Sequence, residues 1–176
     1  ISELRLPKPI SPYGLSKLTA EQYVCLYSRL HGLKTSSLRF FSVYGPRQKK
    51  QVIYDFFKKL KKNPNELEII GDGSQARDFV FVEDVINALL SVSCNSNFDG
   101  EVYNVGSAEM ITTKELAIKI SSVMGLSPQL KYTGKVRKGD PEKWLADISK
   151  INDLGYSPQI TIDQGLEKVW NWLNSI

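Results

Sequence analysis

The fold class of this chain follows from residues 11–46, which read SPYGLSKLTAEQYVCLYSRLHGLKTSSLRFFSVYGP. Apolar side chains recur at helical spacing over residues 13–31, and Gly32 stands where a left-handed helix cap is needed. Residues 34–43 then predict a strand, which closes at the Tyr44-Gly45-Pro46 break. A helix that leads directly into a strand favours an α/β fold.

The same alternation of helix and strand continues to the end of the chain. A capping-box pattern at Thr112 and Glu115 predicts the start of one of the later helices, and Gly125 follows the end of that helix. We therefore expect further helices at 51–62, 84–93, 112–123 and 161–173, and further strands at 67–70, 79–82, 101–105 and 130–132. The sequence predicts an α/β protein throughout.

Composition excludes several classes of protein. The 176 residues are 41% hydrophobic and 24% charged, which is typical of a soluble globular protein. No apolar run approaches the ~20 residues that span a bilayer, so we expect no membrane partner. Cys25 and Cys94 support neither a disulfide framework nor a zinc site, so we expect no metal and a cytoplasmic location. The chain opens at Ile1 rather than at Met, so we expect an upstream segment.

The net charge of +4 has two interpretations. Lysines gather within residues 49–62, and such a cluster is compatible with nucleic-acid contact. It is also the pattern of the solvated face of an amphipathic helix. Basic and aromatic residues do not interleave here as they do in RNA-binding sheets, so we expect no nucleic-acid partner.

Two places match the pattern Tyr-x-x-x-Lys. Tyr54 and Lys58 lie within the lysine-rich helix, where a chance match is expected. Tyr13 and Lys17 stand at the head of the first helix, and a spacing of four residues puts both side chains on one helical face. A nearby ammonium favours the phenolate, which can take a proton from a substrate hydroxyl. The alternative is that Tyr13 is an ordinary half-buried helix residue.

Residues 11–17 resemble the Ser-Pro-Tyr-x-x-Ser-Lys motif of the nucleotide-sugar members of the extended short-chain dehydrogenase/reductase family. Further blocks resemble this family in the same order along the chain. They are 38–47 (Leu-Arg-Phe-Phe-Ser-Val-Tyr-Gly-Pro-Arg), 71–85 (from Gly-Asp-Gly to Val-x-Asp-Val), 103–106 (Tyr-Asn-Val-Gly) and 137–156 (Arg-x-Gly-Asp to Leu-Gly-Tyr). The resemblance covers almost the whole chain.

The resemblance implies the C-terminal part of a Rossmann-type NAD-binding fold plus a smaller α/β substrate-binding lobe. Residues 1–45 and 76–105 would form the Rossmann-like part, and residues 46–75 and 106–176 the nucleotide-sugar-binding lobe. The family's glycine loop precedes the region that resembles this chain, so we expect the chain alone to be inactive and to bind no NAD with useful affinity. The string at 71–76 matches Gly-x-Gly-x-x-Ala, but extended residues follow it, whereas a cofactor loop must open a helix.

The resemblance also assigns roles to individual residues. Tyr13 would be the general acid and base, Lys17 would bind the nicotinamide ribose, and Phe41 would lie against NAD. The substrate-binding positions would be Ser42, Gln51, Arg77, Arg137, Asp140 and Trp144. Among them the two arginines would clamp a diphosphate, although a surface ion pair is the commoner role of an arginine. Asp140 would accept hydrogen bonds from the nucleotide ribose. We hypothesise that the bulk of Trp144 favours plain hexoses, and the alternative is that Trp144 is a residue of the hydrophobic core.

The function implied is NAD-dependent epimerisation at C4 of a nucleotide-activated hexose of the UDP-glucose/UDP-galactose type, through a 4-keto sugar. One alternative is a 4,6-dehydratase, and another is a redox-inactive relative that uses the fold for binding or regulation. We also expect a homodimer, because an incomplete sheet leaves edges for another surface to cover.

Overall fold

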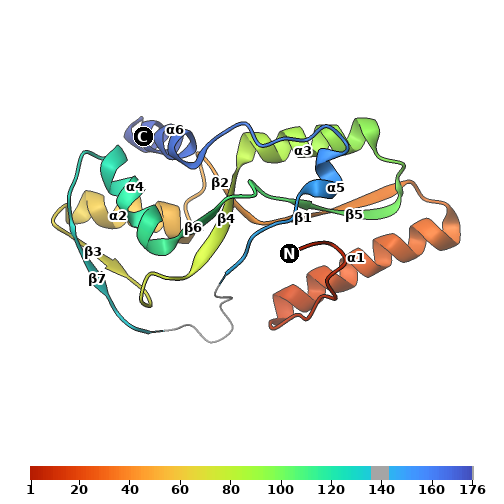
Figure 1. Cartoon of the computed structure of the whole chain (residues 1–176), viewed down its shortest axis with the longest axis horizontal. Helices are drawn as coiled ribbons and strands as arrows, with labels where there is room; N and C mark the ends of the chain where they lie inside the picture. Colours follow the sequence, from red (N-terminus) through yellow and green to blue (C-terminus); the bar gives the residue numbers. More distant parts are fainter. Residues whose placement is uncertain (136–142, 176) are drawn as a thin grey trace.

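The computed structural model describes residues 1–135 and 143–175 and confirms the α/β class. Its helices are α1 (Pro12–His31), α2 (Gln51–Lys62), α3 (Val82–Asn95), α4 (Thr113–Val123), α5 (Ser149–Asn152) and α6 (Ile162–Asn174). Its strands are β1 (Thr35–Phe40), β2 (Ser42–Tyr44), β3 (Glu66–Ile69), β4 (Ala76–Phe81), β5 (Asp99–Val105), β6 (Met110–Thr112) and β7 (Gln129–Tyr132) (Figure 1).

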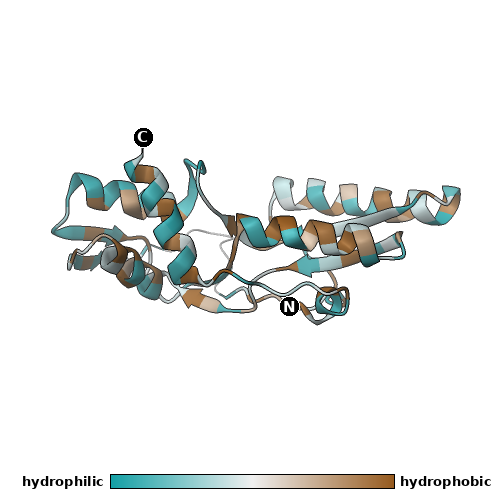
Figure 2. Ribbon diagram, turned by 90° about the horizontal axis from the view of Figure 1, so that it is seen from above, coloured by the Kyte–Doolittle hydropathy of each residue, from teal (hydrophilic) through white to brown (hydrophobic). Residues whose placement is uncertain are grey.

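The strands form three small sheets. β1 pairs with β5 in parallel, β3 pairs with β7 in parallel, and β4 lies between the parallel β2 and the antiparallel β6. Helices α1 and α3 lie on opposite faces of the β1–β5 pair (Figure 1). Seen from above, the molecule is elongated (Figure 2). Helices α1 and α3 lie towards one end, and α2, α4 and α6 are grouped at the opposite end (Figure 1).

The expectation of one strand over residues 34–43 is wrong. The structure divides this run into β1 and β2, which belong to different sheets. At Phe41 the backbone N–H donates to Val105 at 3.0 Å, and the carbonyl accepts from Val43 at 2.9 Å. This three-residue turn redirects the chain from β5 to β4. No glycine or proline stands at Phe41, and apolar or aromatic residues such as Phe40 and Val43 occur on both sides of it, so the sequence does not mark the turn.

The remaining differences concern short elements and element ends. The sequence predicted neither β6 nor α5, because both are too short to show a hydrophobic period. Strand β4 begins at Ala76 rather than at residue 79, directly after the glycine turn. The string at 71–76 therefore opens a strand and not a helix, which confirms that it is no cofactor loop.

Two hydrophobic cores share strand β4. Phe79 and Phe81 enter the core between α2, α4 and α6, which we call the small-lobe core. Val80 points to the other face and joins the core under α3 and β5, which we call the sheet core. Because successive side chains of a strand face opposite ways, one strand can serve two cores.

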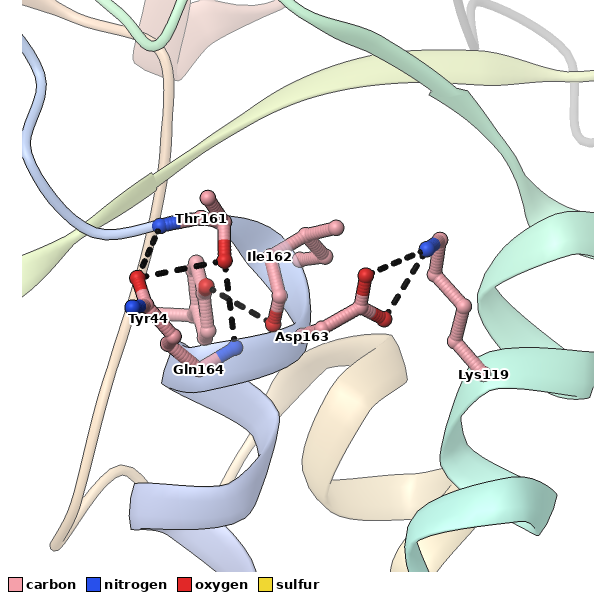
Figure 3. Close-up of polar contacts among 6 residues, drawn as sticks. All are labelled: Tyr44, Lys119, Thr161, Ile162, Asp163 and Gln164. Carbon is pink, nitrogen blue, oxygen red and sulfur yellow. Dashed lines mark hydrogen bonds and ion pairs between the residues drawn. The ribbon is translucent and has the colours of Figure 1, made fainter.

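Helix α6 is fixed to the small-lobe core by contacts at its first turn (Figure 3). Thr161 and Gln164 form a reciprocal capping box, and the buried Tyr44 hydroxyl donates to the Ile162 carbonyl at 3.5 Å. Lys119 of α4 makes a bidentate ion pair with Asp163. The predicted capping box at Thr112 and Glu115 is likewise present at the start of α4.

No helix within residues 1–135 and 143–175 is long and apolar enough to cross a membrane.

Candidate active site

The carboxyl ends of β1 and β5 define one edge of their sheet. In open α/β sheets, ligands bind outside the carboxyl ends of the strands. Helix α1 runs antiparallel to β1, because the chain reverses at Gly32, whose φ of 65° is the left-handed cap that the sequence predicts. The first turn of α1 therefore lies at the same end as the carboxyl ends of both strands (Figure 1).

The start of α1 presents the predicted catalytic pair. Ser11 caps the helix by accepting a hydrogen bond from the Gly14 N–H at 3.0 Å, and Pro12 occupies the first turn. The side chain of Tyr13 is 72% exposed, and the Lys17 ammonium lies 5.6 Å from the centre of its ring. The phenol and the ammonium thus share one open face of the helix, where a substrate hydroxyl can approach both.

A bidentate ion pair holds α1 against β1. Arg39 donates from Nε to Glu21 at 2.8 Å and from Nη2 to the other carboxylate oxygen at 2.6 Å. The hydrogen bond to Glu21 raises the pKa of the Arg39 guanidinium above its ordinary value. Glu21 follows Tyr13 by about two helical turns, or about 12 Å along the axis. The pair therefore anchors α1 to β1 about two helical turns from Tyr13.

Phe41 and Trp144, which have predicted binding roles, contact each other. The rings of Phe41 and Trp144 are tilted against each other with their centres 6.1 Å apart. Phe41 sits at the turn between β1 and β2, and the next residue, Ser42, pairs with Phe79 in the β2–β4 ladder. The structure thus places the predicted cofactor-binding Phe41 beside the predicted substrate-binding Ser42 and Trp144.

Arg77 lies beside the backbone of Trp144. Its Nη1 donates to the Ala76 carbonyl at 3.0 Å, and the backbone N–H of Trp144 donates to that carbonyl at 3.1 Å. One carbonyl oxygen therefore joins the predicted diphosphate-binding arginine to the backbone of Trp144. Arg137 and Asp140 lie outside the described residues.

Gln51 is the first residue of α2, and its side chain is exposed. Its φ is 70°, and that of Arg47 in the preceding loop is 72°. Non-glycine residues rarely adopt this conformation, and such strain is concentrated at functional sites. The structure therefore places Gln51 on a separate element from Arg77 and Tyr13, at the end of a strained loop.

Buried polar residues next to these positions escaped the sequence analysis. Asp78 is 0% exposed and Asn104 is 1% exposed, and each is hydrogen-bonded to backbone groups of distant segments. For Asp78 the available signal was its position directly before the apolar run Phe-Val-Phe-Val, because a carboxylate buried with such a strand requires hydrogen-bond partners.

Two surface pockets lie in the small lobe. One shallow pocket is lined by Tyr54, Lys58, Lys61 and Leu173, and another by residues of α4 and the loop that follows it. The described residues contain no cluster of three or more His, Cys, Asp or Glu side chains suited to a metal.

Comparison with known proteins gives consistent matches. Residues 2–106 match the model of the NAD dependent epimerase/dehydratase family. An uncharacterised UDP-glucose epimerase of Bacillus subtilis is 33% identical over 100% of this chain and 56% of its own length.

Solved structures of epimerases superpose on almost the whole chain. The UDP-glucose 4-epimerase of Thermotoga maritima with UDP-glucose has a TM-score of 0.91 at 32% identity, and the match covers 99% of this chain and 57% of that one. The UDP-glucuronic acid 4-epimerase of Bacillus cereus, in complex with UDP-glucuronic acid and NAD, has a TM-score of 0.90 at 32% identity, with coverage of 99% and 56%. This chain therefore spans about half the length of the relatives it matches.

Proposed function

The chain belongs to the NAD dependent epimerase/dehydratase family, and from that premise we propose that the complete protein epimerises a nucleotide-activated hexose at C4. UDP-glucose and UDP-galactose are the proposed substrates, because the relatives described above are named for UDP-sugars. The observation that carries the proposal is the exposed face of α1, where Tyr13 and Lys17 stand together at the carboxyl edge of β1 and β5.

The residues present fit one end of NAD. The open face at Tyr13 and Lys17, with the phenyl ring of Phe41 on the adjoining strand turn, suits a nicotinamide and its ribose. Within residues 1–135 and 143–175, no glycine-rich turn opens a helix that would hold the pyrophosphate. We therefore propose that this chain alone binds NAD weakly and is inactive, and that the rest of the protein supplies the glycine loop.

NAD, when bound, would supply the hydride acceptor and donor. Tyr13 would hold and move the proton: it would take the proton of the C4 hydroxyl and would later return it. Loss of that proton together with the hydride on C4 would give the 4-keto sugar. Lys17 would hold its positive charge beside the Tyr13 ring and would bind the ribose. If the keto sugar rotated between the two proton transfers and presented its opposite face, the product would have the inverted configuration at C4.

The substrate would be held at its diphosphate. A guanidinium binds phosphate by paired, charge-assisted hydrogen bonds, so we assign this role to Arg77 and Arg137, and ribose binding to Asp140. Ser42 stands where many family members carry Asn, and its shorter side chain would donate a hydrogen bond to the phosphate or the sugar. Gln51 would contact the nucleotide from the first turn of α2.

Trp144 would set the range of sugars. It packs on Phe41 and remains 44% exposed, so its ring would form a wall of the sugar pocket. We propose that this wall favours plain hexoses over 2-acetamido sugars. The measurement is the ratio of kcat/KM for UDP-glucose to that for UDP-N-acetylglucosamine in the complete protein. Equal values for the two sugars would contradict the assignment.

The central test replaces Tyr13 with Phe in the complete protein. Loss of a general acid and base should lower kcat by about 10²- to 10⁴-fold. Tyr54→Phe is the matched control, because Tyr54 also precedes a lysine by four residues but lies on α2 in the small lobe, and it should leave kcat unchanged. Epimerisation is measured as conversion of UDP-galactose to UDP-glucose. Parental turnover by the Tyr13→Phe variant would refute the proposal.

The second candidate is a 4,6-dehydratase, because the matched family includes dehydratases. A dehydratase would release a 4-keto-6-deoxy sugar from the same keto intermediate, so product analysis separates the two reactions. A redox-inactive relative is the third, and the presence of both Tyr13 and Lys17 argues against it.

We further propose a cytoplasmic homodimer. Helix α1 leaves an apolar surface open, since Leu15, Tyr23 and Leu30 are 55%, 61% and 66% exposed. Large exposed apolar patches are typical of interaction surfaces. Light scattering of the complete protein gives the oligomeric state, and a monomer at micromolar concentration would contradict the proposal.

A further inference from the structure

Asp78 is a fully buried carboxylate on β4, directly after Arg77. Its Oδ1 accepts hydrogen bonds from the backbone N–H of Ser107 at 2.7 Å and from the hydroxyl of the same residue at 2.9 Å. Its Oδ2 accepts from the backbone N–H of Ala108 at 3.2 Å and of Ala146 at 3.1 Å. Backbone and hydroxyl donors thus compensate the burial of the carboxylate.

These hydrogen bonds join segments that are far apart in the sequence. One is the turn after β5, where Ala108 has a φ of 58°, a conformation that a non-glycine residue keeps only when its surroundings hold it. The other is the segment 143–148, which we call the strap. A Cβ added to Gly106 would lie 2.5 Å from Asp78 Oδ2 and 2.7 Å from Ala146 Cβ, so the turn and the strap meet at Asp78 without spare room.

The strap carries Trp144 into the candidate site. Its Lys143 bridges to Ala76, and its Trp144 N–H donates to the same Ala76 carbonyl that accepts from Arg77. Asp78 then fixes the strap at Ala146, two residues beyond Trp144. The strap is therefore fastened to β4 on both sides of the tryptophan.

We propose that Asp78 is a positioning residue for the nucleotide-sugar site, because it holds the strap so that Trp144 and Arg77 reach the same substrate. This inference rests on the proposed function. An Asn at position 78 has nearly the same volume but only one acceptor oxygen, and its NH₂ group would face N–H donors. Such a variant must release either Ser107 or the pair Ala108 and Ala146.

The test compares Asp78→Asn with Asp84→Asn in the complete protein. Asp84 is the matched control, because it is 1% exposed and its carboxylate accepts from the backbone N–H groups of Gln159 and Ile160 at 3.0 and 3.1 Å. Those residues precede Thr161, the N-cap of α6 that Figure 3 labels, and they are not part of the strap. Both variants should lower the Tm, so the loss of stability alone does not distinguish them.

Displacement of Trp144 and Arg77 should weaken substrate binding. For Asp78→Asn we expect kcat/KM for UDP-glucose to fall about 10- to 100-fold, mostly through KM, because small misplacements cost rates of this order. The Kd for UDP, measured by calorimetry, should rise in parallel, while the bound NAD content stays at the parental level. Asp84→Asn should keep the parental KM and the parental Kd for UDP.

The outcomes separate the inference from the function on which it rests. A parent that neither binds UDP nor converts UDP-glucose overturns both. An active parent whose Asp78→Asn variant keeps its KM, or whose Asp84→Asn variant shows the same rise in KM, overturns the positioning role alone. If Asp78→Asn does not fold, Ser107→Ala replaces it: loss of one hydroxyl donor should raise KM about 3-fold. An unchanged KM in that variant would also overturn the positioning role.

Discussion

The ion pair between Glu21 and Arg39 should contribute more to stability than an ordinary surface pair. Its side chains are 12% and 27% exposed, and two hydrogen bonds join them. Exposed pairs contribute about 0–1 kcal/mol, whereas removal of one partner from a fully buried pair costs about 3–5 kcal/mol. For this partly buried, bidentate pair we expect Glu21→Gln to cost about 2 kcal/mol, with a coupling energy to Arg39→Gln of about 1–2 kcal/mol.

Urea unfolding of the complete protein measures this coupling in a double-mutant cycle. The control cycle uses Glu66 and Lys131, whose side chains are 42% and 53% exposed on neighbouring strands, and should give at most about 0.5 kcal/mol. High salt should weaken the control pair more than the buried one. Equal coupling energies in the two cycles would refute the argument that partial burial and forked geometry strengthen the pair.

Three further predictions concern the small lobe. In Gly165→Ala the new Cβ would lie 2.7 Å from the Cζ atom of the buried Tyr44 ring, so unfolding in urea should show a loss of about 1–3 kcal/mol, and parental stability would contradict this. Thr112→Ala removes the cap of α4 and should cost about 1 kcal/mol, whereas Thr112→Ser should cost much less. The pKa of Glu115 is lowered because the backbone N–H and the hydroxyl of Thr112 donate to its carboxylate. The contribution of Glu115 to the free energy of unfolding is therefore complete above the ordinary Glu pKa of about 4.3, and it is lost as the pH falls through the lower folded-state pKa. In Glu115→Gln the free energy of unfolding should consequently change less with pH in that window.

Local signals in the sequence predicted the helices well. The bounds of α2 coincide with the expected range, because one apolar face and one lysine-rich face repeat at helical spacing. The caps also lie where they are expected, at Gly32 because glycine adopts a positive φ and at Thr112 because its hydroxyl accepts a hydrogen bond from the helix backbone. These features depend on residues within a few positions of one another, which a single sequence displays.

Features that depend on distant segments could not be predicted in this way. The chain divides at Phe41 because β1 pairs with β5, whereas β2 pairs with β4. The run Leu-Arg-Phe-Phe-Ser-Val contains no residue pattern that indicates these different partners. The partners of Asp78 lie 29 to 68 residues away and are mostly backbone groups, which have no sequence signature. The pairing of Tyr13 with Lys17 on one face was predictable, because it needs only a helix.

The turn at Phe41 also restricts how this architecture can vary in length. Only Phe41 separates the end of β1 at Phe40 from the start of β2 at Ser42. In β2, the neighbouring residues Val43 and Tyr44 pack into the sheet core and the small-lobe core respectively. Because side chains alternate along a strand, a single inserted residue at Phe41 would turn Val43 towards the small-lobe core and Tyr44 towards the sheet core. Insertions and deletions among homologous chains should therefore avoid this junction and accumulate in surface connections, such as the one between α3 and β5.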